Sequence, residues 1–179
     1  MKHPTTLAAA ILITAFVAVG GLVKYASQPA FVSRAEHQQQ MQQAELRQRF
    51  EQAVVMLHAR QYDHAITALH RVLELAPRLP EAHVNMGYAL LGLEQAQAAR
   101  GFFQAAVELN PRQANAYYGL ALAAEAAGDY ESALGAMRTY LHFTPADDSH
   151  RPRARAALWE WEEKLGRHAQ APAAGPRKP

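Results

Sequence analysis

The chain has 179 residues, of which 50% are apolar and 19% are charged, a balance that excludes a wholly disordered protein. It contains no cysteine, which excludes disulfide bonds, zinc–thiolate sites, iron–sulfur clusters and a thiol nucleophile. The formal net charge is +2, but residues 46–166 hold 12 basic and 14 acidic side chains, so the positive excess lies near the two ends and argues against a nucleic-acid-binding domain.

The first segment in chain order, residues 1–24, contains 20 consecutive residues without charge ahead of Lys24. As a helix these residues would span about 30 Å, the thickness of the hydrocarbon core of a bilayer. We therefore expect an uncleaved transmembrane anchor. Two alternatives stay open: a signal peptide cleaved after Gly20, which Ala18 and Gly20 would allow, and a buried core helix.

The charges that flank this segment give almost no preference for orientation, since Lys2 lies on one side and Lys24 with Arg34 on the other. The few residues that precede the uncharged span are more simply left in the cytosol than moved across the membrane. The expected location is the inner (cytoplasmic) membrane, with a single pass and the C-terminal domain in the periplasm. Cleavage would instead release a soluble periplasmic protein.

Residues 25–45 form a polar connecting segment. Pro29 should interrupt any continuation of the first helix, and Ser33 with Glu36 has the form of a capping box that opens a new one. The following residues are strong helix formers with few apolar side chains. This composition predicts a polar helix that runs into the first repeat helix, with a flexible glutamine-rich tether as the alternative.

The strongest signal in the chain is a repeat of 34 residues. Met86–Gly87 stands one period before Leu120–Ala121. The other recurring positions are Tyr62, Ala65, Leu69, Leu75 and Pro77, then Ala96, Ala99, Phe103, Leu109 and Pro111, and then Tyr130, Ala133, Met137, Phe143 and Pro145.

This pattern predicts that each unit is a pair of helices of about 14 residues joined by a short turn. Gly128–Asp129 supplies that turn in the third unit, and a proline ends each unit because it cannot continue a helix. Small residues are needed where two helices touch, since a large side chain would hold the axes apart. These small residues are Ala65, Gly87, Ala99, Ala121 and Ala133.

The pattern resembles the tetratricopeptide repeat family, with units at 46–79, 80–113 and 114–147. The resemblance implies an all-α solenoid of helical hairpins wound into a right-handed superhelix. Three positions depart from the family pattern: Arg60 replaces a turn glycine, Gln52 replaces a leucine, and His83 replaces the large aromatic residue that Tyr117 retains in the third unit.

Residues 148–166 resemble the capping helix that family members place after the last repeat. The apolar side chains of this segment fall on one helical stripe, and Trp159 and Trp161 point to different sides, so at least one should be buried. Gly166 can end the helix. Residues 167–179 are small, polar and proline-bearing, and we expect them to be disordered.

The resemblance also implies which residues line the inner wall of the superhelix. Such a wall favours an amphipathic helix or an extended apolar peptide of a partner protein, unless the connecting helix, the capping helix or a second copy covers it. The expected wall residues are Phe50, Val54, Leu57, His58, Val84, Asn85, Tyr88, Leu91, Asn115, Tyr118, Leu122 and Glu125.

One subgroup of the family binds C-terminal carboxylates with a lysine–asparagine–arginine clamp. The matching positions hold no cation and only Asn85 resembles the clamp, so chaperone-tail binding of that type is not expected. These positions are Phe50, Val54, Asn85, Asn115 and Gly119.

No catalytic or metal-binding motif is found in the sequence. His58, His64 and His70 recur every six residues and so do not share a helix face, and Asp147–Asp148 is typical of a turn or cap. HExxH, phosphate-loop and GxSxG motifs are absent. We therefore expect no enzyme, cofactor or metal.

The features together predict a membrane-anchored adaptor that binds a protein or peptide partner. Two alternatives remain: an accessory subunit of an envelope assembly system (cytochrome c maturation, pilus or secretion), which rests on family analogy, and a homo-oligomer that buries its own groove.

Overall fold

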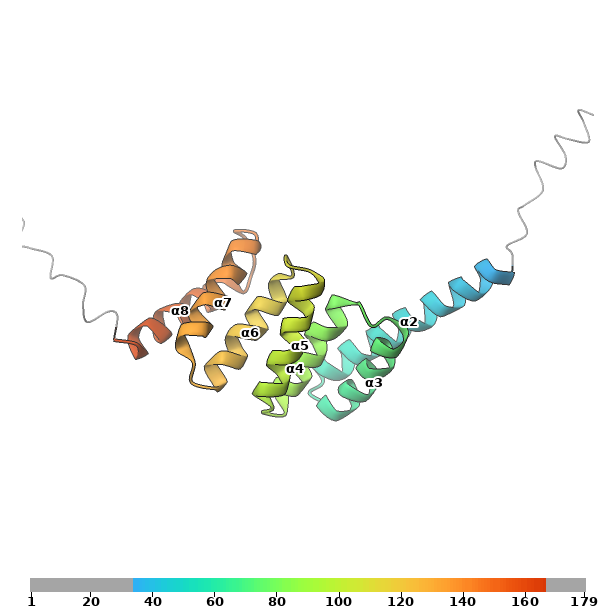
Figure 1. Cartoon of the computed structure of the whole chain (residues 1–179), viewed down its shortest axis with the longest axis horizontal. Coiled ribbons are helices and arrows are strands. Elements are labelled where there is room, and N and C mark those ends of the chain that lie inside the picture. Colours follow the sequence, from blue (N-terminus) through green and yellow to red (C-terminus); the bar gives the residue numbers. More distant parts are fainter. Residues whose placement is uncertain (1–33, 167–179) are drawn as a thin grey trace, which may run out of the picture. The chain divides into compact units, whose positions relative to one another are not determined.

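The computed structural model describes residues 34–166, and all its regular elements in that range are α-helices (Figure 1), which confirms the all-α prediction. They are α2 (Arg34–His58), α3 (Tyr62–Leu75), α4 (Pro80–Gly92), α5 (Ala96–Leu109), α6 (Ala114–Ala126), α7 (Tyr130–Phe143) and α8 (Arg151–Lys164). Within this range no helix combines the length and the apolar character needed to cross a bilayer. The predicted anchor or signal segment (1–24) and the predicted disordered tail (167–179) lie outside the described residues.

Helix α2 is continuous over 25 residues and contains the described end of the polar segment as well as the first repeat helix. Residues 34–45 therefore form the predicted polar helix and not the flexible tether that was the alternative. Glutamine, alanine and glutamate favour the helix, and Arg49 pairs with Glu45 one turn away at 2.8 Å. The compact unit that holds the repeats begins at Gln42.

Successive helices form hairpins that follow one another along the chain (Figure 1). Helix α4 pairs with α5 and α6 with α7, and the second helix of each hairpin packs against the first helix of the next. In the first hairpin, Ala53 of α2 shares a buried cluster with Leu69 and Val72 of α3. Small side chains permit this close approach: Ala65, Ala99, Ala121 and Ala133 are all fully buried.

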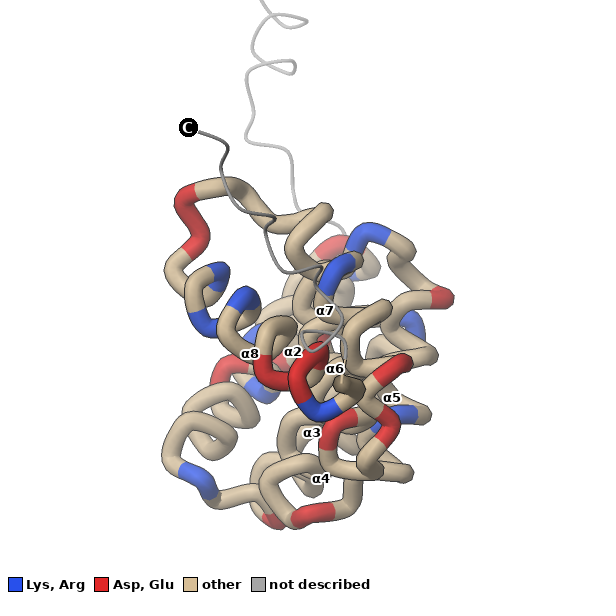
Figure 2. Tube along the Cα trace, turned by 90° about the vertical axis from the view of Figure 1, so that its left-hand side faces the viewer, with Lys and Arg blue, Asp and Glu red and all other residues tan. Residues whose placement is uncertain are grey.

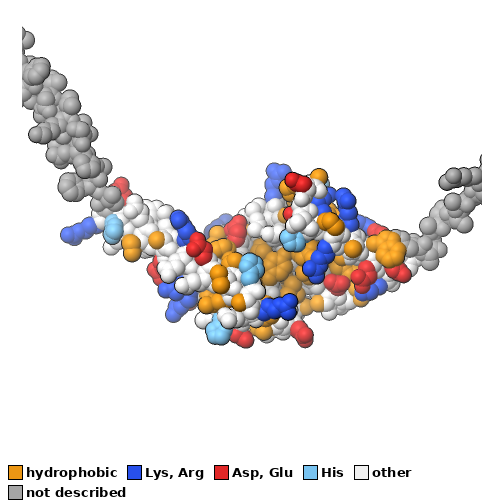
Figure 3. Space-filling model, turned by 180° about the vertical axis from the view of Figure 1, so that it is seen from behind, with side chains coloured by type: hydrophobic (Ala, Val, Ile, Leu, Met, Phe, Trp, Pro, Cys, Tyr) orange, Lys and Arg blue, Asp and Glu red, His pale blue; other side chains and the backbone are white. Residues whose placement is uncertain are grey.

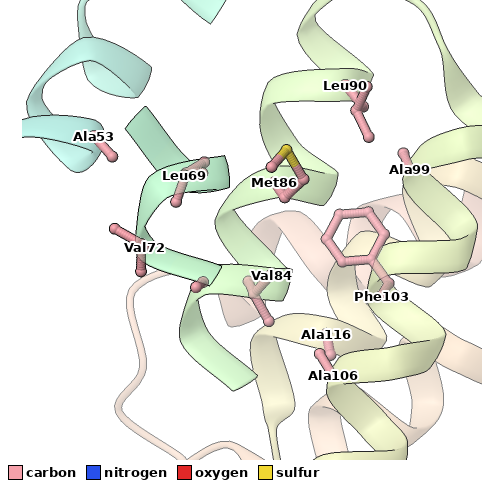
Figure 4. Packing of buried hydrophobic residues seen from close by; sticks show 11 residues of the cluster. Ala53, Leu69, Val72, Val84, Met86, Leu90, Ala99, Phe103, Ala106 and Ala116 are labelled. Atoms are coloured by element: carbon pink, nitrogen blue, oxygen red, sulfur yellow. The ribbon is translucent and has the colours of Figure 1, made fainter. Parts of the chain in front are cut away.

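Phe103 fills the space that two glycines leave open. A Cβ atom at Gly87 would lie 2.6 Å from the Phe103 ring, and one at Gly119 would lie closer still. Figure 4 shows the fully buried ring reaching from α5 toward α4, where Met86 lies. One aromatic side chain thus joins α4, α5 and α6 and requires glycine on both first helices.

His83, one of the three departures from the repeat pattern, keeps the contact that its aromatic counterpart makes. Nε2 of His83 lies 2.9 Å from the carbonyl oxygen of Pro77. One period later the hydroxyl of Tyr117 donates to the carbonyl oxygen of Pro111 at 3.0 Å. Both side chains therefore tie the start of a first helix to the proline that ends the preceding unit.

The turns inside the three hairpins place equivalent residues in the left-handed region of backbone conformation. These are Arg60 (φ 58°), Glu94 (φ 61°) and Gly128 (φ 74°), spaced 34 residues apart. Only glycine adopts this conformation without a steric cost from its side chain.

Glu94→Gly is therefore expected to raise the free energy of unfolding by about 1 kcal/mol, because the left-handed backbone is strained for glutamate. Thermal unfolding followed by circular dichroism measures the gain. Glu94→Ala is the matched control, since alanine also carries a Cβ atom. An equal gain with alanine would show that backbone strain is not the cause.

Helix α8 covers the end of the third hairpin. Trp161 is fully buried and its Nε1 donates to Glu125 Oε1 at 2.8 Å, while Trp159 is 58% exposed. This confirms that one tryptophan of the pair is buried. Arg138 of α7 pairs with Glu162 at 2.6 Å, and Gly166 follows the helix at φ 68°. The predicted capping helix thus packs on α7.

Candidate functional site

A hollow of about 530 Å³ collects side chains from the first helix of every repeat unit. Four of its lining residues are tyrosines, and we call it the tyrosine hollow. Figure 3 shows a recessed hydrophobic surface bordered by histidine and basic side chains. The lining residues are Leu57, His58, Tyr62, Asn85, Tyr88, Asn115, Tyr118, Tyr140, His150 and Arg153.

Half of the predicted wall residues meet in this hollow, including the tyrosines of α4 and α6. Those that line it are Leu57, His58, Asn85, Tyr88, Asn115 and Tyr118. The assignment of Val84 to the wall is wrong. Its side chain is 3% exposed and belongs to the buried cluster that contains Val72 and Ala116, because it lies where consecutive hairpins close on each other.

The remaining predicted wall residues lie outside the tyrosine hollow. Phe50 lines a separate hollow of about 350 Å³ with Leu46 and Leu79. Leu91 is half-buried against the first core cluster, and the carboxylate of Glu125 is occupied by Trp161. Val54 and Leu122 are also half-buried and line none of the hollows described here.

The tyrosine rings are held by the core beneath them. Tyr88 meets Phe103 edge-on, with ring centroids 5.1 Å apart, and its hydroxyl donates to the carbonyl oxygen of Asn115 at 2.9 Å. Tyr118 meets Tyr140 in the same manner at 5.1 Å. Burial raises the pKa of Tyr88, and the neighbouring Tyr118 and Tyr140 raise it further, so the phenol stays neutral. The aromatic surface is thus fixed before any ligand binds.

The C-terminal edge of the hollow is fastened by Asp148. Its Oδ1 accepts from the Tyr140 hydroxyl at 3.0 Å and from the backbone N–H of His150 at 2.8 Å. The bond from His150 is the main cause of the lowered pKa of Asp148. Burial, followed by the bond to Asp148, raises the pKa of Tyr140 to about 12. Arg151 Nη1 donates to the carbonyl oxygens of Leu141 and Thr144, which fixes the start of α8.

Four lining residues were missed because they do not lie on the first helices. Tyr62 begins α3, Tyr140 lies on α7, and His150 and Arg153 lie at the start of α8. Tyr140 could have been found, since the two earlier units place Val72 and Ala106 at the same repeat position, and a hydroxyl at a core position needs a polar neighbour. Nothing in the sequence shows that α8 reaches the hollow.

Two carboxamides in the hollow are available to a ligand. The side chains of Asn85 and Asn115 come from consecutive units and have no hydrogen-bond partner within residues 34–166. Each carboxamide offers two donors and an acceptor, the groups that pair with a peptide backbone. In the same range no three histidine, aspartate or glutamate side chains gather closely enough to hold a metal ion.

The family model described as tetratricopeptide repeat matches residues 50–113 and 84–149. Among curated proteins, the cell division cycle protein 27 homolog of Caenorhabditis elegans is 35% identical over 63 residues. That match covers 35% of this chain and 8% of the relative, so the chain corresponds to a small part of that protein.

Solved structures share the fold at low identity. The first TPR of Spaghetti (RPAP3) bound to an HSP90 peptide has a TM-score of 0.62 and 21% identity, covering 68% of this chain and 93% of that one. The Sgt2 TPR domain from Aspergillus fumigatus gives 0.64 and 18%, covering 75% and 88%. PcrH in complex with the chaperone-binding region of PopD gives 0.64 and 15%, covering 69% and 95%.

Proposed function

Because the chain belongs to the tetratricopeptide repeat family, we propose that it is an adaptor whose tyrosine hollow binds a segment of a partner protein. The observation that supports this best is the pairing of fixed aromatic rings with unpartnered carboxamides from consecutive units. Two of the similar structures hold a protein or peptide ligand, the HSP90 peptide on Spaghetti and the PopD region on PcrH.

The bound segment is extended. A helix satisfies its own backbone amides, whereas an extended segment offers free N–H and C=O groups to Asn85 and Asn115. The rings of Tyr88 and Tyr118 supply apolar contact area at little entropic cost, since they are already ordered.

The N-terminal 20-residue uncharged span supports a second part of the proposal, that the adaptor is anchored in the inner membrane with its repeats in the periplasm. An accessory role in envelope assembly is a narrower form of the same proposal. Protease digestion of spheroplasts tests the orientation: repeats that are protected until the inner membrane is lysed would contradict it.

The test of partner binding is the double variant Asn85→Ala with Asn115→Ala in the full chain purified in detergent. The fold should be retained, because neither side chain bonds to another described residue. Binding of the co-purifying partner should fall about tenfold, since two hydrogen bonds to the ligand are lost.

Gln97→Ala with Gln104→Ala is the matched control, because it removes two exposed carboxamides of α5 outside the tyrosine hollow. It should bind as the wild type does. Tyr88→Ala with Tyr118→Ala should abolish binding. Retained binding in both hollow variants would place the partner site elsewhere.

A further inference from the structure

The lining of the tyrosine hollow holds one arginine and two histidines but no carboxylate side chain. His58 comes from the first unit, and His150 and Arg153 come from α8, while the lining contains no aspartate or glutamate. Two carboxylates beside the hollow already have partners. Asp148 accepts from the Tyr140 hydroxyl and the His150 backbone N–H and lies 3.6 Å from His150 Nδ1, and Glu125 accepts from Trp161. Figure 2 shows basic residues gathered at the start of α8.

Arg153 differs from several other arginines of the described chain in lacking a partner. Arg49, Arg71 and Arg138 each pair with a glutamate. Arg153 is exposed and forms no hydrogen bond or ion pair within residues 34–166. Because Arg151 and Asp148 fix the start of α8, the backbone that carries Arg153 is fixed beside the hollow, and the free guanidinium can pair with a carboxylate there.

The ends of this chain cannot supply that carboxylate from a side chain. Residues 1–33 and 167–179 contain no aspartate or glutamate. They hold the basic residues Lys2, Lys24, Arg167, Arg177 and Lys178. Like charges disfavour docking of these segments beside Arg153, and an acidic segment of another protein is the complementary occupant.

We propose, on the basis of the function proposed above, that the tyrosine hollow binds an acidic extended segment of the partner protein. One carboxylate side chain pairs with Arg153, and a second lies toward His58. Because His58 comes from the first unit and Arg153 from α8, one carboxylate is needed for each, and a peptide has only one terminal carboxylate. At least one of the two is therefore an internal aspartate or glutamate side chain.

The test is selection of random peptides of about twelve residues, displayed without a free C-terminus, on the immobilised full chain. Selected peptides should be enriched in aspartate and glutamate. With Arg153→Gln as the bait the enrichment should be lost. Synthetic amidated copies should bind this variant about tenfold more weakly than the wild type in fluorescence anisotropy.

Arg155→Gln is the matched control. It removes the same charge two residues away, at an exposed position that does not line the hollow, and should leave both selection and affinity unchanged.

The outcomes separate this inference from the function on which it rests. Two results would overturn the acidic-segment proposal and leave the hollow as the binding site. In the first, the peptides lose affinity for the Asn85/Asn115 variant but are not enriched in acidic residues. In the second, the acidic enrichment persists when Arg153→Gln is the bait. Peptides that bind the hollow variants as tightly as the wild type would overturn both the acidic-segment proposal and the proposed function. Failure to select any peptide overturns the acidic-segment proposal, and the function proposed above then depends on how the Asn85/Asn115 variant binds the co-purifying partner.

Discussion

Phe103→Ala is expected to lower the free energy of unfolding by about 3–5 kcal/mol, the loss typical of removing a fully buried phenylalanine ring. The cavity would open between Gly87 and Gly119, which have no side chains to fill it. Because the ring also supports Tyr88, the variant should weaken the hollow as well as the core. Denaturant unfolding followed by circular dichroism measures the change.

The neighbouring Phe102→Ala is the control, since it removes the same atoms from a half-buried position. We expect a loss of about 1 kcal/mol, because less apolar surface leaves the core. Equal losses for the two variants would contradict the role given to Phe103 as the side chain that joins α4, α5 and α6.

Trp161→Ala is expected to cost about 3–5 kcal/mol as well. The indole is fully buried in the C-terminal cluster with Ala121 and Met137, and its loss leaves the Glu125 carboxylate without the bond at 2.8 Å. Undocking of α8 would also displace Arg153 from the tyrosine hollow. The melting temperature and peptide affinity should therefore fall together.

Trp159→Ala separates this effect from the loss of a tryptophan as such. Trp159 is 58% exposed, so its removal should change the free energy of unfolding by less than about 1 kcal/mol. A large loss at Trp159 with little at Trp161 would mean that α8 packs through its opposite face.

The repeat could be predicted from the sequence because its geometry imposes the period. Fully buried alanines such as Ala65, Ala99 and Ala133 recur where hairpin helices touch, and no larger residue fits there. Even a departure such as His83 fits, because the contact it makes with Pro77 depends on position more than on residue type.

The site was predicted only in part. The repeat position of a residue on its own helix does not show whether a neighbouring helix covers that residue. Val84 has the position expected of a wall residue but is buried where the next hairpin packs. The contributions of His150 and Arg153 depend on where α8 docks, and that docking depends on long-range contacts such as Trp161 with Glu125. These two residues are 36 positions apart in the sequence, and a single contact of this kind leaves no periodic signal.

Photo-crosslinking tests most directly whether the partner segment lies in the tyrosine hollow. A benzophenone amino acid replaces Leu57, which lines the hollow and has no proposed bond to the segment, or, in a second variant, Gln104 on α5 outside it, and each full-length chain is irradiated with a selected peptide. We expect a crosslinked product from position 57 and none from position 104. Crosslinking from position 104 with none from position 57 would contradict the assignment of the hollow as the binding site.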